Sequence, residues 1–333
     1  MMEPERILAI RIKSIGDVVF TLPAIHALRE RFPVARLHYL VSQEHAELLG
    51  GFRDVDEIIP LDRKMFSNGS PFAVALGIAR LMRRLRRSRF DLAVDFQGFG
   101  ETEWLSYFSG APERLGNVYN AHRGWTYTRT SNRGVTTHPA EWNLALLRTL
   151  DINPGALRNE YLLPEEPLNA ARDFFRAKGL SPERPTLFLQ PFTSNDEKNW
   201  PLDKYSELAN YHRQQGMQII FGGGPGDRAR LELVQASDFC VAAGTPLLVS
   251  AGLMKLSSVI VGADTGLLHL ANAMGKRVIM IMRSNQPGSS HPFQHPDWAV
   301  TCGPGKKITE VPVGEVTRAC ALALNLRHGN VSC

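Results

Sequence analysis

A carboxylate follows an apolar run near the start of the chain. The run ILAIRI (7–12) precedes the loop KSIGD, in which Asp17 comes directly after Gly16. Taken alone, this loop favours a helix cap, because a carboxylate stabilises the amino end of a helix. The alternative is chemical, since a carboxylate at the end of a buried strand can act as a general base. Gly16 allows a tight turn or the close approach of a ligand, and both roles of Asp17 stay open.

The segment ADTGLLHLANAMG (263–275) combines a carboxylate, a hydroxyl and a glycine where a helix is expected to begin. Free backbone N–H groups at such an end bind phosphate, and Gly266 lets a ligand approach them. A helix cap by Asp264 and Thr265 explains the same residues equally well. His269 falls one turn into the helix, where a lone histidine is more often structural than a ligand.

The polar loop FTSNDEKNWPL (192–202) follows another apolar run. Its hydroxyls, Thr193 and Ser194, and the ammonium group of Lys198 suit phosphate oxygens. A solvated loop is the alternative. Its position after a strand, in the same half of the chain as 263–275, favours a binding role.

A third loop, GGGPGDRAR (222–230), contains a loose match to the dinucleotide-binding pattern GxGxxA. A nicotinamide-dependent oxidoreductase is therefore an alternative function. The match is weak because no acidic residue follows at the end of a second strand to bind the ribose. A glycine-rich wall against a nucleotide base or ribose explains the loop more simply.

The segment RLMRRLRRSRF (80–90) carries arginines on one helical face and apolar residues on the other. A solvated amphipathic helix is the default interpretation. The alternative is a surface that meets anionic lipid headgroups.

Short apolar runs alternate with amphipathic segments along the whole chain. The runs typical of buried strands are 7–12, 36–41, 57–61, 91–96, 186–190, 218–223, 258–263 and 277–282. The helical segments are 23–32, 78–87, 168–177, 202–214, 246–255, 265–274 and 313–327, with a kink or restart expected at Pro23. This alternation predicts two α/β domains with doubly wound parallel sheets. A proline-containing stretch at 147–167 separates them, which divides the chain into 1–160 and 161–333.

Bulk composition limits the function classes. The chain has 333 residues, of which 44% are hydrophobic and 21% charged, as in globular proteins. No apolar run approaches the ~20 residues of a membrane span, and the start MMEPER does not read as a signal peptide, so a cytoplasmic location is expected. The four cysteines lack metal-ligand spacing, and no nucleic-acid-binding signature occurs. A formal net charge of +5 suggests anionic ligands.

Three stretches together resemble glycosyltransferase family 9, the ADP-heptose:lipopolysaccharide heptosyltransferases. They are RIKSIGDVVFTLPAIHALRERFP, PFTSNDEKNWP and GADTGLLHLANAMGKRVI. The resemblance implies a GT-B fold, in which two Rossmann-like domains face a central cleft. Residues 1–160 would bind the acceptor and 161–333 the nucleotide sugar, with the last helix packing back on the first domain.

The resemblance also implies roles for single residues. Asp17 matches the family's catalytic base, and Lys198 the lysine that reaches the donor diphosphate. The other donor-binding positions would be Thr193, Ser194, Asp227, Asp264, Thr265, Gly266, Leu267 and His269. The acceptor-binding positions would be Gly16, Arg63, Lys64 and Gln97.

The implied reaction is an inverting transfer of heptose from ADP-heptose to an anionic Kdo- or heptose-bearing lipid A. No DxD motif stands in a suitable place, so we expect transfer without a metal and without a cofactor, with the ADP-sugar as co-substrate. The expected location is cytoplasmic and peripheral to the inner face of the inner membrane, with no transmembrane segment and no nucleic-acid partner. The alternatives are the oxidoreductase, a family member using a different nucleotide sugar, and a binding protein without activity.

Overall fold

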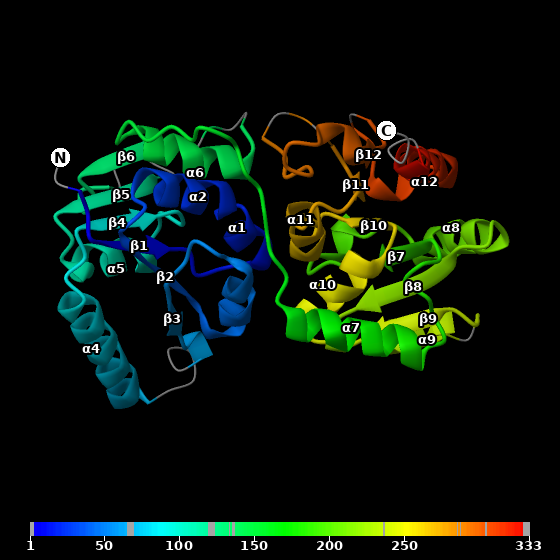
Figure 1. The fold of residues 1–333 in the computed structure, drawn as a ribbon, viewed down its shortest axis with the longest axis horizontal. Coiled ribbons are helices and arrows are strands. Elements are labelled where there is room, and N and C mark those ends of the chain that lie inside the picture. The colour runs from blue at the N-terminus through cyan, green and yellow to red at the C-terminus, as the bar shows by residue number, and fades with distance from the viewer. Residues whose placement is uncertain are drawn as a thin grey trace. The chain divides into compact units, whose positions relative to one another are not determined.

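The computed structural model describes residues 3–64, 70–118, 124–132, 134, 137–235, 237–284, 286, 288–303 and 305–328. The chain divides into two compact units between Glu160 and Tyr161 (Figure 1). We call them unit 1 and unit 2 and describe each by itself. Among the described residues, no helix is both long and apolar enough to cross a membrane.

Unit 1 is built on one six-stranded sheet in which every neighbouring pair is parallel. Its strands, in spatial order, are β3 (Glu57–Leu61), β2 (Arg36–Ser42), β1 (Arg6–Ile10), β4 (Leu92–Asp95), β5 (Glu113–Val118) and β6 (Arg129–Asn132). Its helices are α1 (Ile15–Val19), α2 (Leu22–Arg31), α4 (Pro71–Arg87), α5 (Glu101–Ser109) and α6 (Pro139–Arg148), with a 3₁₀ segment η1 (Gln43–Gly51).

Unit 2 repeats this plan. Its strands, in spatial order, are β12 (Ala299–Thr301), β11 (Val278–Met282), β10 (Val259–Ala263), β7 (Thr186–Gln190), β8 (Gln218–Gly223) and β9 (Cys240–Ala243). Its helices are α7 (Glu165–Ala177), α8 (Leu202–Gln214), α9 (Arg228–Gln235), α10 (Leu247–Leu256), α11 (Gly266–Ala273) and α12 (Val313–His328). The short 3₁₀ segments are η2 (Asp196–Lys198), η3 (Pro225–Asp227), η4 (Pro296–Trp298) and η5 (Ile308–Glu310).

The central strands explain why these apolar runs fold as a sheet. Every residue of β7, β10 and β11 is buried, as expected for a parallel sheet covered by helices on both faces. Pro23 acts as predicted: α1 ends at Val19 and a new helix, α2, begins at Leu22 with the proline in its first turn.

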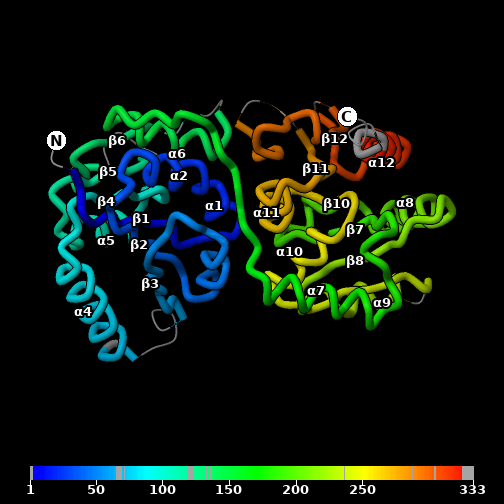
Figure 2. Tube along the Cα trace, viewed as in Figure 1, coloured from blue at the N-terminus to red at the C-terminus, as the bar shows by residue number. Residues whose placement is uncertain are grey.

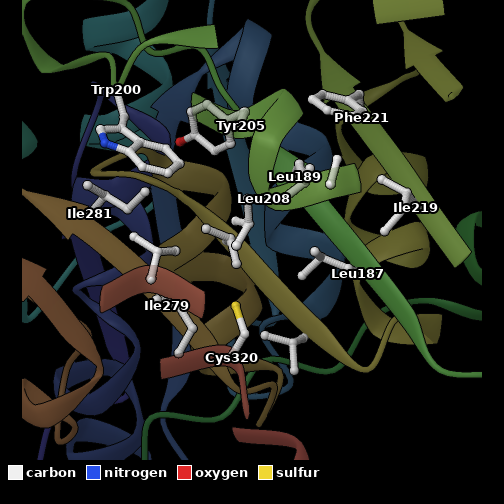
Figure 3. Packing of buried hydrophobic residues seen from close by; sticks show 14 of the residues in the cluster. Leu187, Leu189, Trp200, Tyr205, Leu208, Ile219, Phe221, Ile279, Ile281 and Cys320 are labelled. Carbon is white, nitrogen blue, oxygen red and sulfur yellow. The ribbon is translucent and has the colours of Figure 1, made fainter. Parts of the chain in front are cut away.

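The core of unit 2 surrounds Trp200 and Tyr205, whose rings meet edge to face at 4.9 Å (Figure 3). The Trp200 indole N–H also donates to the Val311 carbonyl oxygen at 3.0 Å. The last helix, α12, contributes Val316, Cys320 and Ala323 to this same core. Packing of α12 on unit 1 stays a prediction.

Both sheets reverse their strand order at one point. Connections run outward in opposite directions from the pair β1 and β4 in unit 1, and from the pair β7 and β10 in unit 2. Ligands of such sheets bind outside the carboxyl ends of the strands at this topological switch point. The loops after these four strands are therefore the candidate sites.

The predicted fold class is confirmed, since each half is a parallel sheet with flanking helices. The eight predicted strands are all present, with ends that differ by at most two residues. Sequence patterns missed four strands, namely β5, β6, β9 and β12. These four are short or polar. Three of them, β6, β9 and β12, are edge strands and β5 lies next to an edge, so pairing with neighbouring strands rather than an apolar run defines them.

Candidate functional site

Two loops of unit 2 meet through a single carboxylate. Asp264 follows β10, and Lys198 ends η2 in the loop after β7. The Lys198 Nζ lies 2.8 Å from Asp264 Oδ2, and the Ser290 hydroxyl donates to the same oxygen at 2.9 Å. The other oxygen, Oδ1, lies 2.9 Å from His269 Nε2. Both carboxylate oxygens are therefore held by polar partners.

The start of α11 explains this geometry. Thr265, rather than Asp264, is the N-cap residue, and its hydroxyl oxygen accepts from the Leu268 N–H at 3.4 Å. His269 lies one turn into the helix, almost fully buried, and reaches back to Asp264. Asp264 therefore does not cap the helix. Its carboxylate contacts the side chains of Lys198, His269 and Ser290 instead.

Charge and burial oppose each other at Asp264. Burial by itself raises the pKa of this carboxyl, because the charged form is poorly solvated. The hydrogen bond and charge of His269, followed by those of Lys198, outweigh burial and hold the pKa well below its usual range. Asp264 is therefore an anion, and it holds the Lys198 ammonium group and the His269 ring in place where the two loops meet.

A pocket of about 410 Å³ opens beside this cluster. Lys198 and Asp264 line it together with Arg283 and Ser289, which stand on the segment after β11. Within the described part of the chain, the Ser289 hydroxyl is buried and has no hydrogen-bond partner. Sequence reasoning missed Arg283, Ser289 and Ser290. The rule that ligands bind in loops after strands could have found them, since β11 was among the predicted strands.

The loop after β7 is shaped by its own side chains. The Thr193 hydroxyl donates to the Asn195 carbonyl oxygen at 2.7 Å, and the Thr193 N–H donates to Asn199 Oδ1 at 2.8 Å. Ser194 is exposed. The buried Trp200 anchors the far end of the loop in the core. Lys198 thus stands on a loop that is tied down at both ends.

Asp227 lies in η3, after β8, and has structural contacts. Its Oδ2 accepts from the Gly224 N–H at 2.9 Å, and its Oδ1 lies 3.8 Å from Arg230 Nη1. The glycine-rich loop therefore follows β8, one strand away from the switch point between β7 and β10. A dinucleotide fingerprint belongs on a switch-point strand, so this geometry does not favour the oxidoreductase alternative.

In unit 1, Asp17 lies in the first turn of α1, three residues after the N-cap residue Ser14. Arg11 Nη2 lies 2.5 Å from Asp17 Oδ2, and the Ser14 hydroxyl donates to the same oxygen at 3.0 Å. Arg11 is itself buried and donates to the Phe96 carbonyl oxygen at 2.8 Å. The Asp17 carboxylate, whose side chain is 37% exposed, is thus oriented at the carboxyl end of β1 and open to solvent.

The loop after β4 supports the loop that carries Asp17. Gln97, predicted to bind the acceptor, is fully buried, and its Oε1 accepts from the N–H groups of Ile12 and Lys13 at 3.1 Å each. Gly98 has a φ of +68°, and a Cβ there would lie 1.4 Å from the Asn117 carbonyl oxygen, so only glycine fits. In the structure, Gln97 holds the backbone at Ile12 and Lys13, where the loop that leads to Asp17 begins.

Buried Asp95 completes this support. Its Oδ1 accepts from the N–H groups of Gln97 and Gly98, and its Oδ2 from the Tyr127 hydroxyl at 2.6 Å. Burial raises the pKa of this carboxyl above its ordinary value.

Arg63 and Lys64 follow β3, the outermost strand on this side, two strands away from β1. Arg63 Nη1 lies 4.0 Å from Glu44 Oε1, and Lys64 is exposed. No hydrogen bond or ion pair links either residue to Asp17 in the described part of unit 1. Over the same described ranges, no group of three or more His, Cys, Asp or Glu side chains could hold a metal ion.

Known proteins resemble this chain over most of its length. The family model for glycosyltransferase family 9 (heptosyltransferase) matches residues 78–310. Lipopolysaccharide heptosyltransferase 1 of Pseudomonas aeruginosa is 27% identical over 289 residues, which are 85% of this chain and 80% of that protein. Lipopolysaccharide core heptosyltransferase OpsX of Haemophilus influenzae is 22% identical over 308 residues, with 90% and 84% covered.

Solved structures agree on the fold. The glycosyl transferase family 9 structure from Veillonella parvula has a TM-score of 0.83 at 20% identity, covering 97% of each chain. ADP-heptose lps heptosyltransferase II of E. coli has a TM-score of 0.79 at 22% identity, covering 97% of this chain and 99% of that one. The predicted GT-B class is thereby confirmed, and the family match spans more than half of the sequence. The chain is a glycosyltransferase and belongs to glycosyltransferase family 9.

Proposed function

We propose that this chain transfers heptose from ADP-heptose to the inner core of lipopolysaccharide, with a Kdo- or heptose-bearing lipid A as acceptor. Curated relatives carry the name lipopolysaccharide heptosyltransferase, which supports the substrate class. The observation that carries the proposal is the junction of Lys198, Asp264 and His269 at the switch point of unit 2. It combines a cation, an anion and a helix start beside a pocket of nucleotide-compatible size.

Unit 2 binds the donor in this proposal. Lys198 leaves Asp264 and pairs with the diphosphate, while the N–H groups of Gly266 and Leu267 at the start of α11 face the phosphate oxygens. Without Lys198, Asp264 Oδ2 keeps the Ser290 hydroxyl and can accept a further hydrogen bond from a sugar hydroxyl, while Oδ1 keeps its contact with His269. We also keep four predicted positions for binding the nucleotide sugar. Ser194 and Thr265 would contact it, whereas Thr193 and Asp227 would act by fixing the shape of their loops.

Unit 1 binds the acceptor and supplies the base. The acceptor hydroxyl oxygen attacks the anomeric carbon and loses its proton to the Asp17 carboxylate. The new bond joins the acceptor oxygen to that carbon, and the bond from the same carbon to the diphosphate breaks. ADP leaves with the bonding electrons, so a single displacement inverts the anomeric configuration.

Negative charge grows on the departing diphosphate. Lys198 and the α11 amide groups are fixed dipoles and charges that stabilise it, so the proposal requires no divalent metal and no cofactor. Arg63 and Lys64, on the loop after β3, provide positive charge for the anionic acceptor. The proposed location of the protein is the cytoplasmic face of the inner membrane.

The test measures donor binding and transfer separately. Thermal unfolding is followed with ADP-, UDP-, GDP- and CMP-linked sugars, since a bound ligand raises the apparent stability. ADP-heptose should give the largest rise, and mass spectrometry should then detect one added heptose on Kdo–lipid A. Stabilisation by another nucleotide sugar alone contradicts the donor assignment, and binding without any transfer contradicts the activity.

A further inference from the structure

Four aromatic side chains gather on the surface of unit 1. Trp104, Tyr107 and Phe108 belong to α5, and Trp125 lies before β6. The Trp104 ring lies 5.7 Å from that of Phe108 and 5.6 Å from that of Trp125, while Tyr107 and Trp125 are 5.8 Å apart, measured between centroids. All four are exposed, with Trp125 at 69%. A contiguous exposed aromatic cluster on a folded protein usually marks a surface that meets a partner.

Arginines of α4 border the same cluster. A hollow of about 560 Å³ is lined by Arg83 and Arg86 of α4 together with Tyr107 and Phe108 of α5. We call these two arginines and the four aromatic residues the aromatic–arginine patch. The helix α4 carries five arginines and no acidic residue. Only Arg84 among them forms an ion pair, with Glu57 at 3.3 Å, in the described part of the chain.

The first half of α4 is also exposed and apolar. Phe72, Leu76 and Ile78 are exposed, and Phe72 reaches 80%. Further along the helix, Leu81, Met82 and Leu85 pack on the core of unit 1. Figures 1 and 2 show α4 running outward from the rest of unit 1 toward its Pro71 end. Apolar side chains therefore share an outward-pointing helix, beside the aromatic cluster, with arginines that form no ion pair in the described part of the chain, Arg84 excepted.

We propose that the aromatic–arginine patch docks on the surface of an anionic lipid bilayer. Tryptophan and tyrosine favour the headgroup level of a membrane, because their rings are apolar with one polar atom. Guanidinium groups pair with lipid phosphates, and each basic residue near such a surface adds about 1 kcal/mol of attraction. An acidic protein partner would use the arginines, but it would not need Phe72 and Trp125 free in solvent. This inference rests on the proposed function in one respect: the proposed acceptor is a lipid, which would be embedded in such a bilayer.

The experiment is co-sedimentation of the full chain with large vesicles. Vesicles of phosphatidylcholine alone are compared with vesicles that also contain phosphatidylglycerol. Wild-type protein should sediment with the anionic vesicles and stay in solution with the neutral ones. Arg83→Gln with Arg86→Gln should weaken the partition coefficient by about fivefold for each charge removed. The matched control is Arg53→Gln with Arg158→Gln, which removes two exposed arginines outside the patch.

The aromatic part is tested in the same assay. Phe108→Ala with Trp125→Ala should reduce binding to the anionic vesicles although it leaves every charge in place, because it removes apolar rings that would enter the headgroup layer. Tyr211→Ala, at an exposed aromatic residue of α8 in unit 2, should bind as wild type does. Thermal unfolding without vesicles verifies that each variant is folded.

Two results would overturn the inference. One is equal loss of binding in the patch and control variants, which would mean that only net charge matters. The other is no sedimentation with either vesicle. If the protein still binds ADP-heptose in that case, the membrane-docking proposal is wrong and the proposed function is unaffected. If the patch binds vesicles but no nucleotide sugar stabilises the protein, the docking proposal is supported and the proposed function is wrong.

Discussion

The Lys198 ammonium nitrogen lies 2.8 Å from Asp264 Oδ2, which joins the loops after two neighbouring strands, β7 and β10. Ser290 donates to the same oxygen from the segment after β11. Three loops that are far apart in the sequence therefore meet at one carboxylate. An anionic ligand in the adjacent pocket would compete with Asp264 for the lysine. Replacing one partner of this ion pair should therefore change the affinity for such a ligand.

Replacing Lys198 with Met should weaken ADP binding. The change removes a cation from the pocket, and a hydrogen bond to a charged group contributes about 1.5–3 kcal/mol. We expect the lower end of that range, because the lysine side chain is 52% exposed and solvent screens its charge. Calorimetric titration with ADP measures the change. Lys306→Met, at another exposed lysine of unit 2, is the control, and equal affinities in the two variants would contradict the role of Lys198.

Replacing Asp17 with Asn should abolish transfer while ADP-heptose still binds. The amide keeps the shape of the side chain but cannot accept the proton, and a positioned base typically contributes 10²–10⁴-fold to the rate. Single-turnover transfer to Kdo–lipid A gives the rate, and titration gives the donor affinity. Ser14→Ala leaves the carboxylate and its contact with Arg11 in place, so we expect a much smaller loss in that control. Substantial transfer by the Asn variant would remove Asp17 from the role of base.

Replacing Ser290 with Ala should destabilise unit 2 in the absence of donor. The hydroxyl group is one of three donors that hold the half-buried Asp264, and hydrogen bonds to a charged group contribute about 1.5–3 kcal/mol. Ser289→Ala removes a neighbouring hydroxyl that has no partner in the described residues, so it should cost less. Urea unfolding of both variants compares the two, and a larger loss for Ser289→Ala would contradict this interpretation.

Lowering the pH below neutral should destabilise the fold through His212 of α8. Burial lowers the pKa of this histidine below its ordinary value of 6.5, so the unfolded chain takes up a proton before the folded one does. Stability is therefore complete above about pH 6.5 and is lost as the pH falls toward the folded-state pKa. His212→Gln, which does not titrate, should show a smaller drop in melting temperature between pH 7.5 and 5.5. An identical drop in both proteins would assign the effect to other groups.

Removing divalent metals should leave both donor affinity and transfer rate unchanged. The proposed stabilisation of the leaving diphosphate comes from Lys198 and the amide groups at the start of α11. The assay is transfer after dialysis against EDTA, with and without added Mg²⁺ or Mn²⁺. Activity that disappears with EDTA and returns with one metal would contradict metal-independent transfer.

Much of the fold could be predicted because the central strands are buried on both faces. Such strands require continuous apolar runs, so ILAIRI and SVIVGA stand out in the sequence. β6, with the sequence RTSN, has no such signal, because its backbone pairing with β5 defines it. The same limit applies to the site. Glycine, aspartate and threonine beside a helix start could be recognised locally, whereas Ser289 and Ser290 lie in a segment without any local motif.

The sequence by itself determined two parallel α/β halves and the loops that follow their strands, because hydrophobic periodicity and turn residues act over a few neighbouring positions. It also placed Asp17, Lys198 and Asp264 in such loops. Only the tertiary structure decided that Lys198, His269 and Ser290 share one carboxylate, and that buried Gln97 and Arg11 support the Asp17 loop. These pairings depend on which strands lie side by side at the switch point. That order is set by pairing between residues 85 positions apart in unit 1 and 72 positions apart in unit 2, which no local pattern encodes.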